Sequence, residues 1–223
     1  MPARCNRGFD LSDLKSVFEN IVARNKWGDQ ESRSGAGSTL SYTYNLRHEL
    51  KKFVAEFKVT TFFDAPCGDF NWMKEITFPK GMKYIGGDIA SSLIRANNSH
   101  YASASKIFIE FDIAKGNFPD CDLWFCRDCL FHLSLDLIFK ALSGFCNSTA
   151  KYLMMTNHLN TSNFRNRNIK SGDFRLLDFH IKPFYLPSDV LYRIPDYVFP
   201  FPQREMCVWS RSQIVDALQG RRS

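Results

Sequence analysis

The chain has 223 residues and a mass of 25.8 kDa, with 44% apolar and 15% aromatic residues, enough to bury one substantial core in one domain. No apolar stretch reaches the length that spans a membrane, and residues 1–30 lack the apolar centre of a secretion signal; we expect a cytoplasmic protein with no membrane partner. The net charge of +6 is spread along the chain, which argues against a nucleic-acid partner.

The N-terminal part is expected to contain two helices joined by an unusual segment. Residues 11–25 carry apolar side chains at spacings of three and four, as an amphipathic helix does, and residues 46–57 resume that spacing. Between them, residues 27–44 are rich in glycine and serine. This composition suits either a flexible linker or an ordered loop over a bound ligand, and the presence of Trp27 favours the loop.

The segment from Phe62 to Met73 is the most informative of the chain. It passes from an apolar strand into an acidic turn with Gly68, and the next strand-like stretch leads to Asp88, which follows Asp64 by 24 residues. Such a turn lets backbone approach a nucleoside, and the second acid can accept hydrogen bonds from ribose hydroxyls. Because the turn lacks the full G-x-G-x-x-G pattern, S-adenosylmethionine fits better than a dinucleotide.

From residue 58 onward, helix-like and strand-like segments alternate, which predicts a mostly parallel sheet with ligands at the carboxyl ends of its strands. The predicted strands are residues 59–63, 83–87, 106–111, 123–126, 152–156, 198–201 and 207–209. Residues 194–196 are predicted to form a turn. Asp64, Asp88, Asp112 and Asp128 all fall near strand ends.

Residues 157–187 form the longest segment without periodicity, and they mix aromatic with polar side chains. Segments of this kind are usually lids or binding loops. Aromatic faces beside Asn, Asp and Arg suit a carbohydrate acceptor, although they can also stack nucleic-acid bases or belong to the core. The expected acceptor-binding residues are Asn157, Arg167, Asp173 and Arg175.

Three of the seven cysteines, Cys121, Cys126 and Cys129, imitate part of an iron-sulfur ligand set. The residues between the first two look like a buried strand, whose alternate side chains face opposite ways. We therefore expect reduced core thiols and no metal ligands among them.

Four stretches together have a recognisable pattern: Trp27-Gly28 with residues 31–38, Asp64-Ala-Pro-Cys-Gly-Asp-Phe-Asn-Trp-Met73, Cys126-Arg-Asp-Cys-Leu-Phe-His-Leu133, and residues 166–184. With them, most of the chain resembles the class I S-adenosylmethionine-dependent methyltransferases. More narrowly, it resembles small enzymes that methylate sugar and glycan hydroxyls, including a domain of large-virus glycan-building proteins. The usual Asn-Arg-Asp-Ile of that group is here Asn166-Arg167-Asn168-Ile169, without a carboxylate at position 168.

The resemblance implies an α/β, Rossmann-like fold with a mostly parallel seven-stranded sheet, helices on both faces and an N-terminal helical cap. It implies one domain, residues 1–223. Within it, residues 1–57 would form the N-terminal helices and a cofactor-covering loop, residues 58–156 the cofactor-binding core, and residues 157–223 the acceptor loop and terminal strands.

The resemblance also implies a cofactor site. Gly68 and the turn at Asp64 would face the methionine part, Asp88 the ribose, and Asp112 with Ile113 the adenine. Structural alternatives are that Asp64 caps a helix and that Asp112 merely ends a strand. The full expected set is Trp27, Ser34, Gly35, Ser38, Asp64, Pro66, Gly68, Asn71, Trp72, Asp88, Ile89, Asp112, Ile113 and Arg127.

Methyl transfer to a hydroxyl needs an acceptor held in line and a base for its proton. Asp128 ends the fourth predicted strand, and His132 follows it by one helical turn. A neutral imidazole suits this task near pH 7, and Asp128 is either the base or the group that orients His132. A divalent metal on Asp128 and Asn157 is the variant we do not favour, because Thr156 and His158 occupy the places of the second carboxylate expected beside Asn157.

The expected function is therefore transfer of a methyl group from S-adenosylmethionine to a hydroxyl of a sugar or glycan. The alternatives are an RNA or small-molecule methyltransferase and a non-catalytic nucleoside-binding module that regulates a partner. The sequence does not indicate an oligomeric state.

Overall fold

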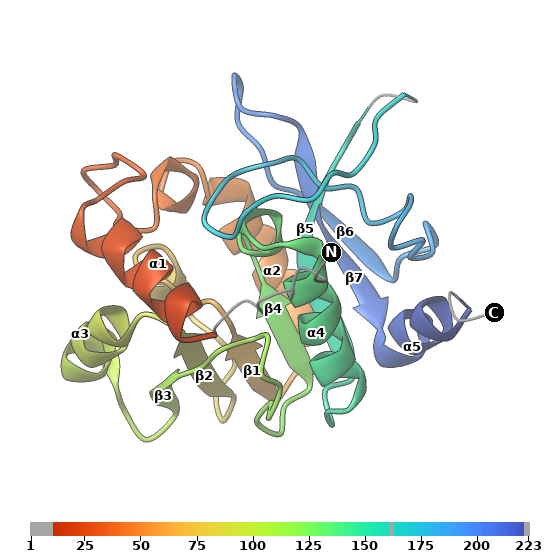
Figure 1. Ribbon diagram of the computed structural model, residues 1–223. Helices are drawn as coiled ribbons and strands as arrows, with labels where there is room; N and C mark the ends of the chain where they lie inside the picture. The colour runs from red at the N-terminus through yellow and green to blue at the C-terminus, as the bar shows by residue number, and fades with distance from the viewer. Residues whose placement is uncertain (1–10, 161–162, 221–223) are drawn as a thin grey trace.

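The computed structural model describes residues 11–160 and 163–220, with side chains from residue 14 onward (Figure 1). Seven strands form one sheet in the order β3-β2-β1-β4-β5-β7-β6. They are β1 (Thr61–Asp64), β2 (Lys83–Asp88), β3 (Lys106–Glu110), β4 (Leu123–Cys126), β5 (Tyr152–His158), β6 (Tyr192–Pro195) and β7 (Arg204–Ser210). Among strands β1 to β5 all neighbours pair in parallel, and β7 runs antiparallel to both β5 and β6. The expected seven-stranded, mostly parallel sheet is confirmed.

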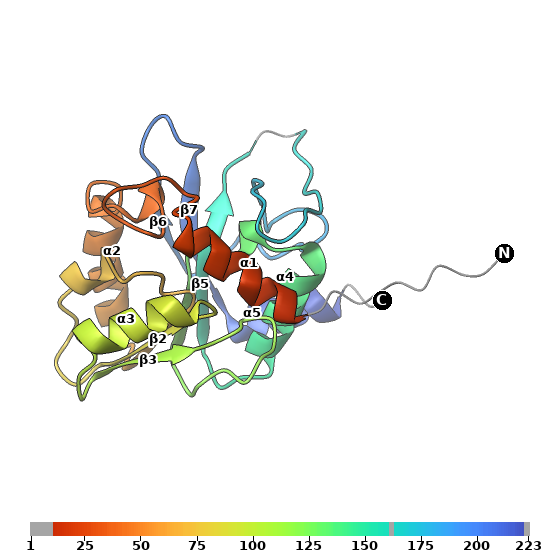
Figure 2. The same cartoon turned by 60° about the vertical axis from the view of Figure 1, so that its left-hand side comes forward.

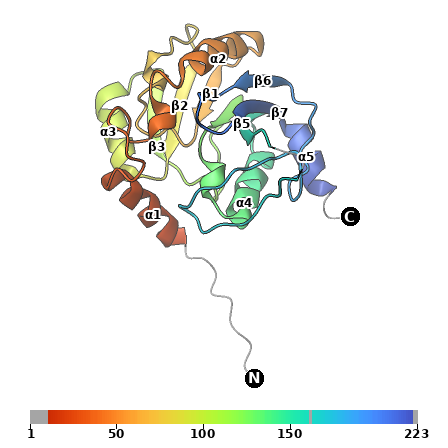
Figure 3. The same cartoon turned by 90° about the horizontal axis from the view of Figure 1, so that it is seen from above.

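Helices cover both faces of the sheet, as expected. They are α1 (Leu11–Ala23), α2 (Tyr44–Glu56), α3 (Ser91–Tyr101), α4 (Leu135–Cys146) and α5 (Arg211–Gln219), with 3-10 turns η1 (Ala36–Ser38), η2 (Met73–Glu75) and η3 (Leu130–His132). Seen from above, α2 lies on one side of the sheet and α1 and α4 on the other (Figure 3). Figure 2 shows α1 crossing in front of the central strands, where it forms the N-terminal helical cap.

The strands read as continuous apolar runs because both faces of the sheet are buried. On β4, Leu123 and Phe125 belong to the core under α2, whereas Trp124 and Cys126 belong to the core under α4 and α5. Successive side chains of a strand point to opposite faces of the sheet, so the four residues of β4 contribute to both cores.

Local sequence explains where two helices begin. The Ser134 side chain accepts a hydrogen bond from the Leu137 amide at the start of α4, and Ser210 with Gln213 forms a capping box at the start of α5. These caps satisfy amides that have no partner within the helix. The first one also fixes the chain directly after η3, which carries His132.

Two predictions at the C-terminal end are wrong. Residues 194–195 belong to strand β6, where a turn was expected, and residues 198–201, expected as a strand, form a turn in which the Phe201 amide donates to the Val198 carbonyl at 3.0 Å. The physical reason is the position of β6 at the sheet edge. An edge strand needs hydrogen bonds on one side only and tolerates a proline such as Pro195.

The six cysteines among the described residues are free thiols, and Cys121 and Cys126 are buried in the core. Within residues 11–160 and 163–220, no helix has the length and apolar character needed to cross a bilayer.

Candidate active site

A cavity of about 350 Å³ lies at the carboxyl ends of the central strands. The four aspartates that follow strands in the sequence, Asp64, Asp88, Asp112 and Asp128, all line it. Its other walls include parts of α1, the loop after Trp27, η3 and the hairpin between β6 and β7. This is the edge at which a sheet of this topology binds its ligands.

The loop after Trp27 is an ordered wall of the cavity. The Asp69 carboxylate accepts hydrogen bonds from the Ser32 hydroxyl at 2.9 Å, the Arg33 amide at 2.7 Å and the Ser34 hydroxyl at 3.2 Å. These bonds tie the loop to the turn after β1. Trp27 and residues 34–38 consequently line the cavity, as an ordered loop does and a flexible linker does not.

Two carboxylates at one end of the cavity differ in their free hydrogen-bonding capacity. Asp88 accepts from the Gly68 amide at 3.0 Å and the Ala90 amide at 2.9 Å, and burial raises its pKa to about 6. Asp112 accepts from the Ala114 amide through Oδ1, but its buried Oδ2 has no hydrogen-bond partner among the described residues. Lys115 Nζ lies 3.6 Å from that oxygen, too far for a hydrogen bond. Asp112 therefore offers a ready acceptor at the cavity wall.

Asp64 is the most deeply buried of these acids. Burial raises its pKa to about 8, although the Tyr84 hydroxyl donates to Oδ2 at 2.5 Å and favours the ionised form. The group is thus largely protonated at neutral pH in the protein alone. A cation bound nearby would favour its ionisation.

Replacing Asp64 by asparagine is expected to make the stability less dependent on pH. A pKa of about 8 in the folded protein, against 3.8 as the ordinary value, means that the stabilisation is full below pH 4 and is lost as the pH rises to 8. The stability of the wild type relative to Asp64→Asn should therefore fall by about 2 kcal/mol between pH 6 and pH 8. Urea denaturation of both proteins at each pH measures this difference, in which the histidine titrations cancel. A difference that is constant with pH would contradict the assignment.

A buried network of two arginines and two aspartates lies at the other end. Arg204 makes a two-pronged ion pair with Asp128, at 2.8 Å and 2.9 Å, and Arg127 makes another with Asp196, at 2.8 Å and 3.0 Å. Arg127 also donates to the Gly37 carbonyl at 2.8 Å. The network joins the end of β4 to the hairpin and to η1. Charges paired in this way are costly to break.

The network makes Asp128 a weak base. Burial acts against the charged form, but the guanidinium groups of Arg127 and Arg204 outweigh it and hold the pKa of Asp128 below its usual range. Asn157 does not join Asp128 as a metal ligand, because its amide oxygen accepts from the Phe179 amide at 2.7 Å and its side chain does not line the cavity. The donor atoms of the metal variant are thus already engaged, and the pair does not fit a metal ion.

His132 has the arrangement of a base. Its Nδ1 lies 2.8 Å from the Asp173 carbonyl oxygen, and since a carbonyl only accepts, Nδ1 carries the proton and Nε2 carries the lone pair. Burial lowers the pKa of the imidazole, so that the ring is neutral near pH 7. The ring lies 5.7 Å from that of Trp27, and both side chains line the cavity.

No protein-family model and no curated protein matches this sequence, but many solved structures match the fold. The magnesium protoporphyrin IX methyltransferase of Synechocystis PCC 6803, with bound SAH, is 12% identical over 89% of this chain and 99% of its own, with a TM-score of 0.58. The methyltransferase domain of bacterial CtHen1 is 12% identical over 77% of this chain and 100% of its own, with a TM-score of 0.57. The chain has the class I methyltransferase fold. The N-methyltransferase NodS of Bradyrhizobium japonicum WM9 is 9% identical over 76% and 96%, with a TM-score of 0.52.

On this methyltransferase fold, every residue expected to bind the cofactor lines the cavity except Asn71. The Asn71 side chain donates instead to Glu31 at 2.7 Å and to the Ser38 carbonyl at 3.1 Å. Asn71 therefore holds the loop that forms the wall. Arg127 lines the cavity, but its hydrogen bonds go to the protein itself.

The acceptor-binding residues expected from the sequence do not line the cavity of the methyltransferase fold. Arg167 is exposed, Asp173 contributes its carbonyl to His132, and Arg175 is buried with a bond from Nη1 to the Phe131 carbonyl. The Asn157 side chain accepts a hydrogen bond from the Phe179 amide. The segment around them does contribute, because Phe174 lines the cavity.

Residues that sequence reasoning missed are His158, Phe174 and Arg204, all in the cavity wall. His158 and Arg204 face each other across the last rung of the β5–β7 ladder. Their only sequence signal is position, since each lies at one end of a strand that the sequence did indicate.

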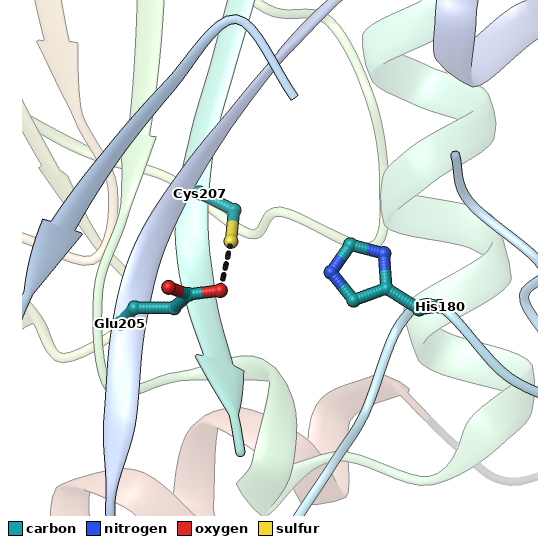
Figure 4. Close-up of side chains that lie close together, drawn as sticks. All are labelled: His180, Glu205 and Cys207. Atoms are coloured by element: carbon teal, nitrogen blue, oxygen red, sulfur yellow. Dashed lines mark hydrogen bonds between the residues drawn. The ribbon is translucent and has the colours of Figure 1, made fainter. Parts of the chain in front are cut away.

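A second group of potential ligands lies outside the cavity (Figure 4). His180, Glu205 and Cys207 bring one ligand atom each to within 4.8 Å of one another. However, the guanidinium of Arg193 contacts Glu205 and lies 3.6 Å from the Cys207 sulfur. The Glu205 carboxylate thus already has a cationic partner, and we assign no metal to this group.

Proposed function

We propose that this protein is an S-adenosylmethionine-dependent methyltransferase that acts on a hydroxyl of a sugar or glycan. The observation that carries the proposal is one cavity with two chemically different ends. One end has three aspartates, of which Asp112 offers an unused acceptor; the other has a neutral His132 among aromatic rings.

The residues at the first end fit the cofactor. Asp112 Oδ2 is a buried acceptor without a hydrogen-bond donor, and the adenine amino group could supply one. We assign Asp88 to the ribose hydroxyls, and Asp64 can ionise next to a positive charge. When bound, the cofactor supplies an electrophilic methyl group on a sulfonium. The fold supports this assignment, since structures of the same fold hold SAM or SAH.

The chain's own residues would then handle the acceptor proton. His132 Nε2 is free to accept it from the hydroxyl, while the bond from Nδ1 to the Asp173 carbonyl keeps the ring oriented. Trp27 and Phe131 border the imidazole with apolar ring surface. Positioning and proton removal are the main contributions such a site makes.

A carbohydrate fits the second end better than RNA does. Phe174 and Phe201 line the cavity and are 52% and 46% exposed, which leaves aromatic surface on which a sugar can stack. The cavity arginines, Arg127 and Arg204, are neutralised by aspartates. A nucleic-acid channel relies on unpaired cations.

The free thiols support a reducing, cytoplasmic location.

Gly68→Ala is expected to weaken S-adenosylmethionine binding by about tenfold or more. Gly68 has φ +56°, and an added Cβ would lie 2.2 Å from the Ser34 hydroxyl, so the loop wall must move. Gly81→Ala is the matched control, since it has φ +88° and free space around its Cβ position. Both variants should lose about 1–2 kcal/mol of stability from the left-handed backbone. Calorimetric titration should find the wild-type affinity for S-adenosylmethionine in Gly81→Ala and a weaker one in Gly68→Ala. Equal affinities in the two variants would show that the loop does not border the ligand.

The function itself is tested by turnover. Purified protein with S-adenosylmethionine and a panel of oligosaccharides should yield S-adenosylhomocysteine and a methylated glycan, with or without a chelator. Binding of the cofactor without turnover on any acceptor would favour a regulatory nucleoside-binding module. Turnover on RNA alone would refute the carbohydrate assignment.

A further inference from the structure

Two histidines from distant parts of the chain meet in the acceptor end of the cavity. His132 comes from η3 and His158 from the end of β5, and both line the cavity. Their rings pack against the same two phenylalanines. The distance between ring centroids to Phe131 is 4.6 Å for His132 and 5.2 Å for His158, and to Phe174 it is 5.9 Å and 6.4 Å in the same order. The imidazoles thus share one small compartment with aromatic walls.

The two rings carry opposite tautomers. His132 Nδ1 faces the Asp173 carbonyl and must hold a proton, which leaves a lone pair on Nε2. His158 Nδ1 accepts a hydrogen bond from the Leu177 amide at 3.2 Å, so its proton is on Nε2. In each ring Nδ1 is directed at the segment 173–177, and the edge with Nε2 is left to face the cavity. One nitrogen can accept a hydrogen bond there and the other can donate one.

The surroundings keep both rings neutral. Burial lowers the pKa of both, and that of His158 falls to about 4. Arg204 disfavours a proton on either ring and Arg175 on His132, while Asp128 acts in the opposite direction. Neutral imidazoles with fixed tautomers are directional partners that tell an acceptor from a donor.

We propose that His132 and His158 form a two-point site for neighbouring oxygen atoms of a sugar. His132 Nε2 accepts from the hydroxyl to be methylated, and His158 Nε2–H donates to the oxygen beside it. The inference rests on the proposed function and narrows it to acceptors in which the reacting hydroxyl has an adjacent hydroxyl or ring oxygen. His158 is then a specificity-determining residue, because a sugar without that oxygen leaves a buried donor unpaired.

A purely structural role for His158 makes different predictions, and two variants separate the roles. His158→Asn can keep an acceptor for the Leu177 amide while removing the donor from the cavity. His158→Gln can keep a donor near the position of Nε2 while removing the acceptor for Leu177. If His158 determines specificity, His158→Asn should impair methylation of the acceptor more than His158→Gln does. If its role is only structural, His158→Gln should lose more stability than His158→Asn, and the loss of methylation in each variant should parallel its loss of stability.

The probes are methyl glycosides of hexoses and 6-deoxyhexoses, each intact and with single hydroxyls removed. For a glycoside that the wild type methylates, His158→Asn should raise the acceptor KM by about tenfold, with a much smaller change in kcat. Removing the neighbouring hydroxyl from the glycoside should raise the KM of the wild type by a similar factor. The same removal should raise the KM of His158→Asn only a little further. An unchanged KM in His158→Asn, with turnover intact in the wild type, would overturn the inference and leave the proposed function standing.

The tautomers can be observed without an acceptor. Long-range proton–nitrogen correlation spectra of the imidazoles at pH 7 should identify His132 as the Nδ1–H form and His158 as the Nε2–H form. A spectrum with His158 as the Nδ1–H form would refute the inference, whatever the enzyme methylates. If the wild type methylates no hydroxyl of any acceptor, the proposed function fails and the inference fails with it.

Discussion

Replacing His132 by asparagine is expected to lower kcat by a factor of about 10²–10⁴ while leaving the affinity for S-adenosylmethionine nearly unchanged. The asparagine amide can still donate to the Asp173 carbonyl that His132 Nδ1 now contacts at 2.8 Å. The substitution therefore keeps the loop contact and removes the proposed base, Nε2. Kinetics with a glycan acceptor and calorimetric titration of the cofactor measure the two effects separately.

The pH dependence of the same reaction provides a second readout. Burial lowers the pKa of His132, and only the neutral ring accepts a proton. The rate should fall as the pH decreases through this pKa, below the ordinary histidine value of 6.5, and should be flat above it. Turnover in His132→Asn at the wild-type rate, with an unchanged pH profile, would show that another group is the base.

Asp128→Asn is expected to destabilise the protein by about 3–5 kcal/mol, because it removes the two-pronged ion pair of the buried Arg204 guanidinium and leaves it with the Asp196 carboxylate 3.5 Å away, which Arg127 already uses. Arg127 retains Asp196, with which it bonds at 2.8 Å and 3.0 Å. The remaining network then carries two positive charges and one negative charge. Turnover should also fall, since the network joins the end of β4 to the hairpin wall of the cavity.

Asp136→Asn is the control for this variant. Asp136 pairs with Lys140 on the surface of α4, where its side chain is 73% exposed, and such a pair contributes less than about 0.5 kcal/mol. Urea denaturation of both variants measures the contrast. If Asp128→Asn lost turnover but kept the stability of the wild type, Asp128 would be the catalytic base and the network would not be structural.

The cofactor end could be predicted from the sequence because its groups lie next to strands with a strong signal. Leu123–Cys126 matches β4 at both ends, since a strand buried on both faces is a short apolar run with clear limits. Asp64, Asp88 and Asp112 follow or end such strands, and parallel strands bring their carboxyl ends to one edge. Position along the chain was therefore enough to place these three acids in one cavity.

The acceptor end depends on contacts between distant residues, which local pattern does not encode. Arg204 pairs with Asp128 across 76 residues, and the cavity-lining ring of His158 accepts a hydrogen bond from the Leu177 amide, 19 residues further along the chain. Asn157 and Arg175, which the sequence assigned to the acceptor, bond to the Phe179 amide and the Phe131 carbonyl instead of lining the cavity. Composition predicted the kind of segment but not which side chains face inward.

Mass spectrometry of a glycan after incubation with the protein and S-adenosylmethionine labelled on its methyl group tests the proposed function most directly. We expect one labelled methyl on a single sugar hydroxyl, with an equal amount of S-adenosylhomocysteine and none from His132→Asn. Label on a nitrogen, label on RNA alone, or cofactor binding without any S-adenosylhomocysteine would contradict the proposed function.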